Sequence, residues 1–193
     1  LAVAYWRFDG GAELADASGN GNALAGSGVV FTNGVARFDG AHTAFALGTA
    51  GTLDLTACTS LTVEFFMRTA TSPATMVLLE QTDNFFYSPG AFIVDVNDGL
   101  DFGGPGRVTG GFRTSTGLNL DMTPLSAAND GQWHHVALVY DRSKAGADRS
   151  AVYFDGTLAQ EAFAGCVDGT PTPFLNAALF IGSRANDNSR YTG

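Results

Sequence analysis

Lysine is almost missing from this chain of 193 residues: Lys144 is the only one, and with the arginines it makes 10 basic residues against 19 acidic ones. The formal net charge is therefore −9. Proteins that bind nucleic acid rely on lysine and arginine to neutralise phosphates. The composition therefore argues against a nucleic-acid partner.

Long apolar runs are missing as well. No stretch approaches the ~18 residues that a membrane-spanning helix requires, so we expect no membrane span. No leader sequence is recognisable and the chain begins with Leu1, so we interpret it as a processed or excised piece of a longer protein.

Long helical periodicity is also missing, whereas glycine accounts for 25 residues and pairs such as Asn-Gly and Asp-Gly punctuate the chain. Frequent turn signals between short apolar runs are typical of all-β proteins. At this length the chain fits one domain with a sizeable core. The sequence predicts a single antiparallel two-sheet β-sandwich over residues 1–193.

Cysteine occurs only twice, at Cys58 and Cys166. The two residues either form one long-range disulfide or remain separate buried thiols. A Gly- and Asn-rich, Lys-poor β-domain is typical of exported proteins, and disulfides persist in oxidising compartments. We therefore predict a Cys58–Cys166 disulfide and an extracellular, cell-surface or periplasmic location.

The stretch 132–141 has an apolar residue at nearly every position, as expected of a central strand that is buried on one face and partly covered on the other. A charged turn at 142–149 and a second apolar run at 151–156 follow. Strand, polar turn and strand predict a hairpin at the centre of the sandwich. His134 and His135 are neighbours on this strand, so their side chains point to opposite faces and we expect no shared zinc ion. We expect Trp133 to be a core or sheet-packing residue rather than a platform for a ligand.

Alternation of apolar and polar residues predicts further strands. In residues 60–68 the expected inward side chains are Leu61, Val63, Phe65 and Met67, and the expected outward ones are Thr62, Glu64, Phe66 and Arg68. A first strand is predicted at 2–8, with Ala4, Trp6 and Phe8 inward. Other strands are expected at 34–40, 44–48, 75–81, 92–96, 100–102, 108–114, 158–163 and 178–183. Residues 115–131 are predicted to form an irregular loop.

Seven segments carry a family likeness: residues 5–9, 16–22, 36–40, 61–68, 133–140, 152–156 and 181–184. In this order they resemble the laminin-G-like, concanavalin A-like jelly-roll domains of bacterial exported proteins. The resemblance implies two curved antiparallel sheets and an accessory, often carbohydrate-binding, module.

Members of that family usually continue with one more strand, which pairs with the first. Here the sequence stops at Gly193. We expect either that residues 2–8 have an unpaired edge that invites self-association, or that the last strand was cut away from the parent protein.

A Gly-rich loop carries the oxygen-bearing side chains of Asp16, Asn20 and Asn22. Hard oxygen ligands in a flexible loop suit Ca²⁺, and the resemblance likewise implies a structural calcium near the sandwich edge. The alternative is an ordinary turn in which Asp and Asn bond nearby backbone groups.

Residues 83–88, in one predicted loop, combine polar residues with three consecutive aromatic residues. Aromatic rings stack on sugars, and nearby polar groups bond the hydroxyls. The predicted glycan-binding residues are Asp83, Asn84, Phe86 and Tyr87, with Arg113 from the next strand. The alternative is that Phe85 or Phe86 plugs the end of the sandwich.

Glutamate is rare, and Glu13, Glu64, Glu80 and Glu161 lie far apart in the sequence. Retaining glycosidases need two close carboxyl groups, and no alternating carboxylate triplet occurs. We therefore predict a non-catalytic module that binds glycans. The alternatives are a structural or protein-interaction domain, and a hydrolase or lyase with an atypical site that uses Asp95 or Glu64.

Overall fold

The computed structural model describes residues 2–26, 28–41, 45–47, 53–71, 74–82, 85–96, 105–115, 119–123, 126–158, 161–162, 170–184 and 191. Within these ranges the chain consists of β-strands and two single turns of 3₁₀ helix, η1 (Phe85–Tyr87) and η2 (Gly146–Arg149). No helix in the described part is long and apolar enough to cross a membrane. The predicted all-β class is confirmed.

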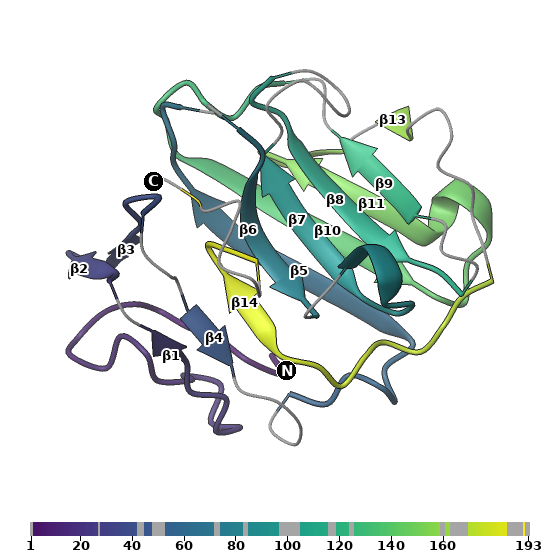
Figure 1. Cartoon of the computed structure of the whole chain (residues 1–193), viewed down its shortest axis with the longest axis horizontal. Helices are drawn as coiled ribbons and strands as arrows, with labels where there is room; N and C mark the ends of the chain where they lie inside the picture. Colours follow the sequence, from purple (N-terminus) through teal and green to yellow (C-terminus); the bar gives the residue numbers. More distant parts are fainter. Residues whose placement is uncertain are drawn as a thin grey trace.

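The strands form two main sheets whose neighbours are all antiparallel, with the smaller sheet behind the larger one in Figure 1. The large sheet has the order β1 (Ala25–Gly26), β4 (Phe45–Leu47), β14 (Leu179–Ile181), β6 (Met76–Gln81), β7 (Phe92–Val96), β8 (Val108–Arg113), β9 (Asn119–Thr123) and β13 (Glu161–Ala162). The small sheet has the order β12 (Thr157–Leu158), β11 (Ser150–Phe154), β10 (His134–Asp141) and β5 (Ser60–Met67). A separate hairpin joins β2 (Val30–Thr32) and β3 (Val35–Arg37).

The predicted hairpin is confirmed as β10 and β11, and β10 pairs on its other side with β5. The inward side chains of β10 include Val136 and Leu138, which are fully buried. From the large sheet, Phe112 stacks on Tyr140 of β10 with ring centres 4.0 Å apart. The core of the sandwich thus lies between the two main sheets.

A glycine allows close packing between the two main sheets. A Cβ at Gly110 of β8 would lie 2.5 Å from Leu138 Cδ1 and 2.8 Å from Val152 Cγ2. Glycine is therefore required here by packing and not by backbone conformation. The large sheet approaches the β10–β11 hairpin at this point.

The predicted alternation of residues 60–68 is confirmed. Leu61, Val63 and Phe65 pack against the core but stay partly exposed, whereas Phe66 lies outward. The cause of the partial exposure is topological: within the described chain, β5 has a strand neighbour only on the β10 side.

The predicted first strand is wrong. Residues 2–8 form no strand, although Trp6 and Phe8 do pack toward the core as expected. The backbone of this segment bonds instead to a loop, since Tyr5 N–H donates to Asp16 Oδ1 and Val3 O accepts from the Asn22 amide. Phe8 also has a positive φ of 57°, which ends the extended run.

The predicted loop at 115–131 is also wrong in part, because residues 119–123 form β9 against β8. Strands are confirmed within 34–40, 44–48, 75–81, 92–96, 108–114, 158–163 and 178–183. The expected strand at 100–102 lies outside the described residues.

Candidate functional site

The predicted glycan-binding loop is described only in part. Asp83, Asn84 and the side chain of Phe86 lie outside the described residues. Phe85 is buried in a small cluster with Val77, Ala91 and Ile93, separate from the main core, so this ring packs against the protein and is not exposed to a ligand. Tyr87 projects into solvent with 82% of its surface exposed.

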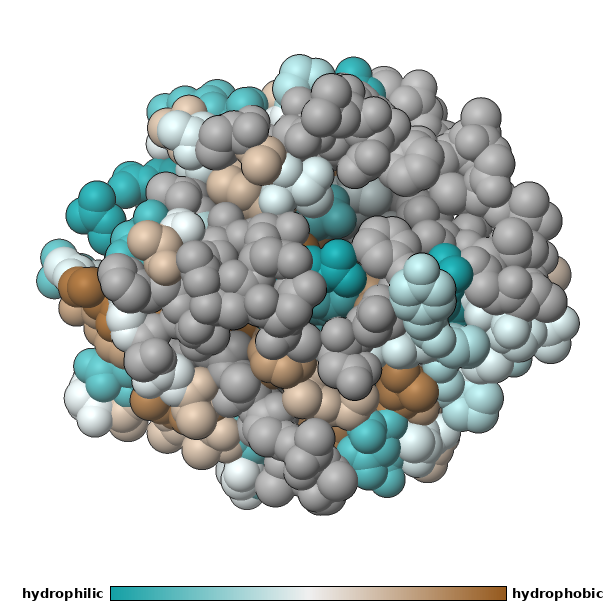
Figure 2. Space-filling model, viewed as in Figure 1, coloured by the Kyte–Doolittle hydropathy of each residue, from teal (hydrophilic) through white to brown (hydrophobic). Residues whose placement is uncertain are grey.

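The backbone of Arg113 does lie beside this loop. Gly90 N–H donates to Arg113 O at 2.7 Å, and Arg113 N–H donates to Ala91 O at 2.9 Å. These bonds fix the end of β8 next to the turn that follows Tyr87. Figure 2 views the molecule from the large-sheet side and shows hydrophilic atoms near the middle of that face.

The structure brings the three predicted calcium ligands together, in a dense hydrogen-bond network. The Asp16 carboxylate accepts the backbone N–H groups of Tyr5, Ser18 and Asn22 at 2.9–3.0 Å. The side-chain amides of Asn20 and Asn22 both donate to Val3 O. Burial works to raise the pKa of Asp16, but the hydrogen bonds from Ser18, Tyr5 and Asn22 outweigh it and leave the pKa well below its ordinary value.

One atom of this loop favours a cation. Asn22 is fully buried, and its Oδ1 has no hydrogen-bond partner. Within the described chain no group of three or more His, Cys, Asp or Glu side chains converges to hold a metal ion. A calcium ion here would therefore take Asn22 Oδ1 and backbone carbonyls together with the remaining lone pairs of Asp16.

The predicted disulfide is not shown: Cys58 is a free cysteine in the structure, and Cys166 lies outside the described residues. Cys58 is partly buried and packs against the core, and its carbonyl accepts Arg142 Nη2 at 2.6 Å. The pairing stays a prediction.

A second surface was not predicted from the sequence. The aromatic face, as we name it, comprises Phe66, Trp133 and Tyr153 with His135, all on the outward side of the small sheet. Phe66 is 71% exposed, Trp133 47% and Tyr153 37%. The expectation that Trp133 is a core residue is therefore wrong. Its odd-numbered position places it on the same side as His135, away from the core.

Polar groups lie between these rings. The Phe66 and His135 ring centres are 4.9 Å apart, and His135 Nε2 lies 3.8 Å from Glu64 Oε2. The guanidinium carbon of Arg68 lies 5.3 Å from the centre of the Trp133 ring. Every ring except that of Tyr153 thus has an observed contact with a polar or charged side chain.

A small side chain lies at the centre of the aromatic face. Ala137 faces outward, and the pairing register places Glu64 on one side of it and Tyr153 on the other. The methyl side chain of Ala137 is smaller than the side chains of its cross-strand neighbours Glu64 and Tyr153.

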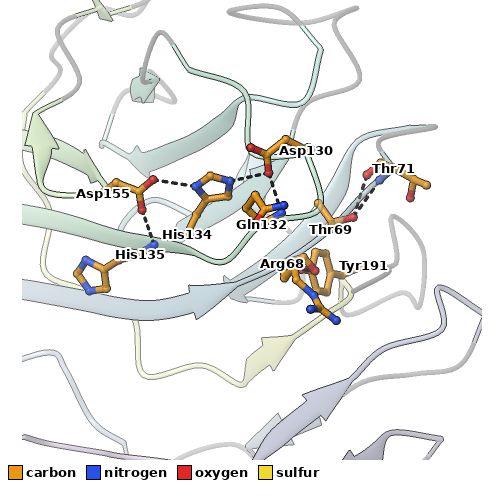
Figure 3. A network of polar contacts seen from close by, with 9 residues as sticks. All are labelled: Arg68, Thr69, Thr71, Asp130, Gln132, His134, His135, Asp155 and Tyr191. Atoms are coloured by element: carbon orange, nitrogen blue, oxygen red, sulfur yellow. Dashed lines mark hydrogen bonds and ion pairs between the residues drawn. The ribbon is translucent and has the colours of Figure 1, made fainter.

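Immediately behind this face, His134 lies between two carboxylates (Figure 3). Its Nδ1 is 2.8 Å from Asp155 Oδ2 and its Nε2 is 3.0 Å from Asp130 Oδ1. The ring also stacks on Phe154 at 4.7 Å. As predicted, His134 and His135 point to opposite faces of β10.

The carboxylates and the imidazole shift one another's pKa. Burial works to lower the pKa of His134, but the hydrogen bonds to Asp155 and Asp130 outweigh it and raise the pKa above 6.5. The bond to His134 is the main reason that the pKa of Asp155 is lowered. The pKa of Asp130 is also lowered, first by the N–H of Gln132 and then by His134.

Two further hydrogen bonds hold the backbone of residues 68 and 69, which follow β5. Gly131 N–H donates to Thr69 O at 2.9 Å, and Tyr191 O–H donates to Arg68 O at 2.7 Å. Burial raises the pKa of Tyr191 to about 12, so this phenol stays a donor at physiological pH. The end of β5 and the turn before Trp133 are thereby connected.

The sequence contained a signal for this face. Residues 60–68 were expected to present Phe66 and Arg68 outward, and alternation on the next long strand places His135 and Trp133 on one side. Only the register, His135 opposite Phe66, was needed to join them.

Comparison with known proteins gives a family and a fold. The Laminin_G_3 family model, described as the concanavalin A-like lectin/glucanases superfamily, matches residues 39–193. No curated protein matches the sequence.

Solved structures share the fold at low identity. Domains LG4-5 of the mouse laminin alpha1 chain superpose with a TM-score of 0.58 at 15% identity, over 84% of this chain and 38% of that chain. A mutant of HCR/D superposes with a TM-score of 0.56 at 12% identity, over 90% of this chain and 42% of that chain. The CBM40 of Ruminococcus gnavus IT-sialidase gives 0.47 at 16% identity, over 72% and 73%. This chain spans about two fifths of the length of the first two structures.

Proposed function

This chain belongs to the concanavalin A-like lectin/glucanases superfamily, and from that premise we propose that it is a non-catalytic module that binds a glycan on its aromatic face. The observation that carries the proposal is the exposure of Phe66, Trp133 and Tyr153 on one side of one sheet. Aromatic rings combine a large apolar surface with defined orientation, which suits the apolar faces of sugar rings.

The polar groups of this surface favour a glycan over a protein partner. The centres of protein–protein interfaces are depleted in charged residues. Here Glu64 and His135 lie among the rings, and Arg68 covers part of Trp133. Ligand sites that pair apolar rings with a few placed polar groups fix a small polar molecule in one orientation.

The loop around Tyr87 is the competing location for the same function. Tyr87 is a single exposed ring in the described part of that loop, and Arg113 approaches it through the backbone. The aromatic face offers several rings with observed polar contacts, so we place the principal site there.

The proposal assigns no catalysis to Asp130 and Asp155, the two carboxylates immediately behind this face. Asp130 and Asp155 are both engaged by His134, and Asp155 also accepts the N–H of His135. A general acid and a nucleophile need a carboxyl pair that faces the sugar. Incubation with a polysaccharide should therefore release no new reducing ends, and release that Asp130→Asn abolishes would indicate a glycosidase.

We also propose that Ca²⁺ binds in the loop of Asp16, Asn20 and Asn22 and stabilises the fold. The buried Asn22 Oδ1 supports this, since a cation would satisfy it. The ion would hold residues 2–8 against the core and would take no part in binding the glycan.

Self-association was expected through an unpaired edge at residues 2–8, but these residues form no strand, so we propose it for the edge of β5 instead. In the described chain β5 has a neighbour on one side only, and an unpaired edge offers backbone donors and acceptors to another strand. Size-exclusion chromatography with light scattering over a range of concentrations tests it, and a constant monomer mass would reject it.

Affinity electrophoresis in gels containing different polysaccharides tests the glycan site. Phe66→Ala and Trp133→Ala should lose the retardation that the parent protein shows, while Tyr87→Ala should keep it. The three substitutions remove exposed rings, so unfolding curves should stay close to the parent. If only Tyr87→Ala loses the retardation, the glycan site lies in the loop around Tyr87. Parent protein that no polysaccharide retards would reject the glycan proposal.

A further inference from the structure

We propose that His134 is a positioning residue that holds the aromatic face in its binding conformation only while its imidazole is protonated. The inference rests on the proposed function for its effect on binding, but the structural part is independent of any ligand. The same face should therefore bind a glycan less tightly when His134 loses its proton.

The geometry requires the charged ring. Nδ1 lies 2.8 Å from Asp155 Oδ2 and Nε2 lies 3.0 Å from Asp130 Oδ1. A protonated imidazole donates from both nitrogens, whereas a neutral one has a single N–H and one bare acceptor. A bare nitrogen at 3 Å from a carboxylate oxygen places two acceptors in contact. Deprotonation therefore breaks one of the two bonds, whichever tautomer remains.

Both carboxylates hold backbone next to the aromatic face. Asp130 Oδ1 also accepts Gln132 N–H at 2.8 Å, in the turn that leads directly into Trp133. Asp155 Oδ1 accepts His135 N–H at 2.8 Å, and Asp155 N–H donates to His135 O. Loss of either bond to His134 thus loosens the support of Gln132, which precedes Trp133, or of His135 (Figure 3).

The other groups around His134 provide no replacement charge. From β5 its register partner is the apolar Met67, and from β11 the ring of Phe154 stacks on it. Of the neighbouring titratable groups, His135 and Glu64 interact with each other on the opposite side of the sheet. Arg68 lies over Trp133. Asp130 and Asp155 are therefore the charges that His134 meets.

The pH range over which His134 supports the aromatic face follows from the directions in which the pKa values of His134 and of the two carboxylates are shifted. The pKa of His134 is raised above 6.5, so the bridge contributes fully below pH 6.5 and is lost as pH rises through the folded pKa. The pKa values of both carboxylates are lowered, so their contribution is lost only under strongly acidic conditions. The aromatic face is therefore held at pH values below the raised pKa of His134 and is released as the pH rises through it.

Nuclear magnetic resonance tests the structural part without a ligand. The imidazole shifts of His134 should titrate with a raised pKa, and the indole N–H of Trp133 should move with the same midpoint. In Asp130→Asn, which keeps the shape and the acceptor for Gln132, the midpoint of His134 should fall. An indole signal that stays fixed while His134 titrates would overturn the proposal.

Glycan affinity measured by calorimetry across the same pH range tests the functional part. The ligand for this titration is the polysaccharide that most strongly retards the parent protein in the affinity gels. Its affinity should fall by about fivefold or more as the pH rises through the pKa of His134. His134→Gln should remove this dependence, whereas His135→Gln, on the same strand but facing outward, should retain it. A profile that follows His135 instead would overturn the positioning role. If no glycan binds, the proposed function fails and the magnetic resonance result still decides the role of His134.

Discussion

The guanidinium of Arg68 lies over the ring of Trp133, with 5.3 Å between the guanidinium carbon and the ring centre. This contact joins the end of β5 to the turn before β10. A cation over an exposed indole contributes about 0.5–1 kcal/mol. Its more specific effect is to limit the orientations of a ring that we place in the binding site.

Replacement of Arg68 by glutamine should therefore weaken glycan binding more than it weakens the fold. We expect the free energy of unfolding to fall by no more than about 1 kcal/mol. Trp133 fluorescence should become easier to quench with acrylamide, and added glycan should protect it less than in the parent. Unchanged quenching would show that Arg68 does not restrain the ring.

Gly110→Ala should destabilise the sandwich by about 1–3 kcal/mol, the usual cost of overpacking a core. The new methyl group would lie 2.5 Å from Leu138 and 2.8 Å from Val152, so the sheets must separate locally. Chemical denaturation measures the change, and Thr62→Ala on the outward side of β5 is the control, expected within about 0.5 kcal/mol of the parent. A neutral Gly110→Ala would mean that the two sheets pack less tightly here.

Arg184→Met should cost about 3–5 kcal/mol, because it leaves a buried carboxylate without its partner. Arg184 donates to Glu80 through Nε at 3.2 Å and Nη2 at 3.1 Å, and the Glu80 side chain is 1% exposed. A Glu80→Gln change added to Arg184→Met should recover much of the loss, since glutamine still accepts the N–H of Phe85. Additive losses in the double variant would contradict a direct pairing.

Calcium should raise the melting temperature, and a chelator should lower it. At a concentration 100 times its Kd, a ligand that binds only the folded state adds about 2.7 kcal/mol. Asp16→Asn keeps one acceptor oxygen for the loop but removes the charge, so it should abolish the difference between calcium and chelator. Identical melting curves for the parent in both solutions would remove calcium from the account.

The Cys58–Cys166 disulfide is tested by intact mass under non-reducing conditions. The bridged protein should be lighter than the reduced protein by two hydrogen atoms and should show no reactive thiol. Closing such a long loop stabilises by roughly 4–5 kcal/mol in the chain-entropy model, so reduction should lower the melting temperature. Two titratable thiols in protein purified under oxidising conditions would disprove the bridge.

The sequence predicted the strands that have a strong local signal. The alternation over residues 60–68 and the hairpin of β10 and β11 were readable because one face of each strand is buried. Residues 2–8 alternate just as clearly, yet they form no strand. Their backbone partners are the side chains of a loop, which alternation does not reveal.

Residues 119–123 show the opposite failure. Polar residues and short runs there indicated a loop, but pairing with β8 makes them a strand. Tertiary context decided the outcome, as often happens for strands with weak intrinsic preference.

The candidate site was predicted less well than the fold, because it depends on register. Phe66 was correctly expected outward, but its position opposite His135 follows only from the pairing of β5 with β10. Trp133 was expected in the core because of its residue type. It lies immediately before the first residue of β10, where it is exposed at the surface.

The most direct test of the account is to map amide shifts of the ¹⁵N-labelled protein during titration with the polysaccharide that retards it most. We expect the largest changes at Phe66, Trp133 and His135, with the loop of Asp16 unaffected. Changes centred on Tyr87 and Arg113, with Phe66 and Trp133 unmoved, would contradict a glycan site on the aromatic face.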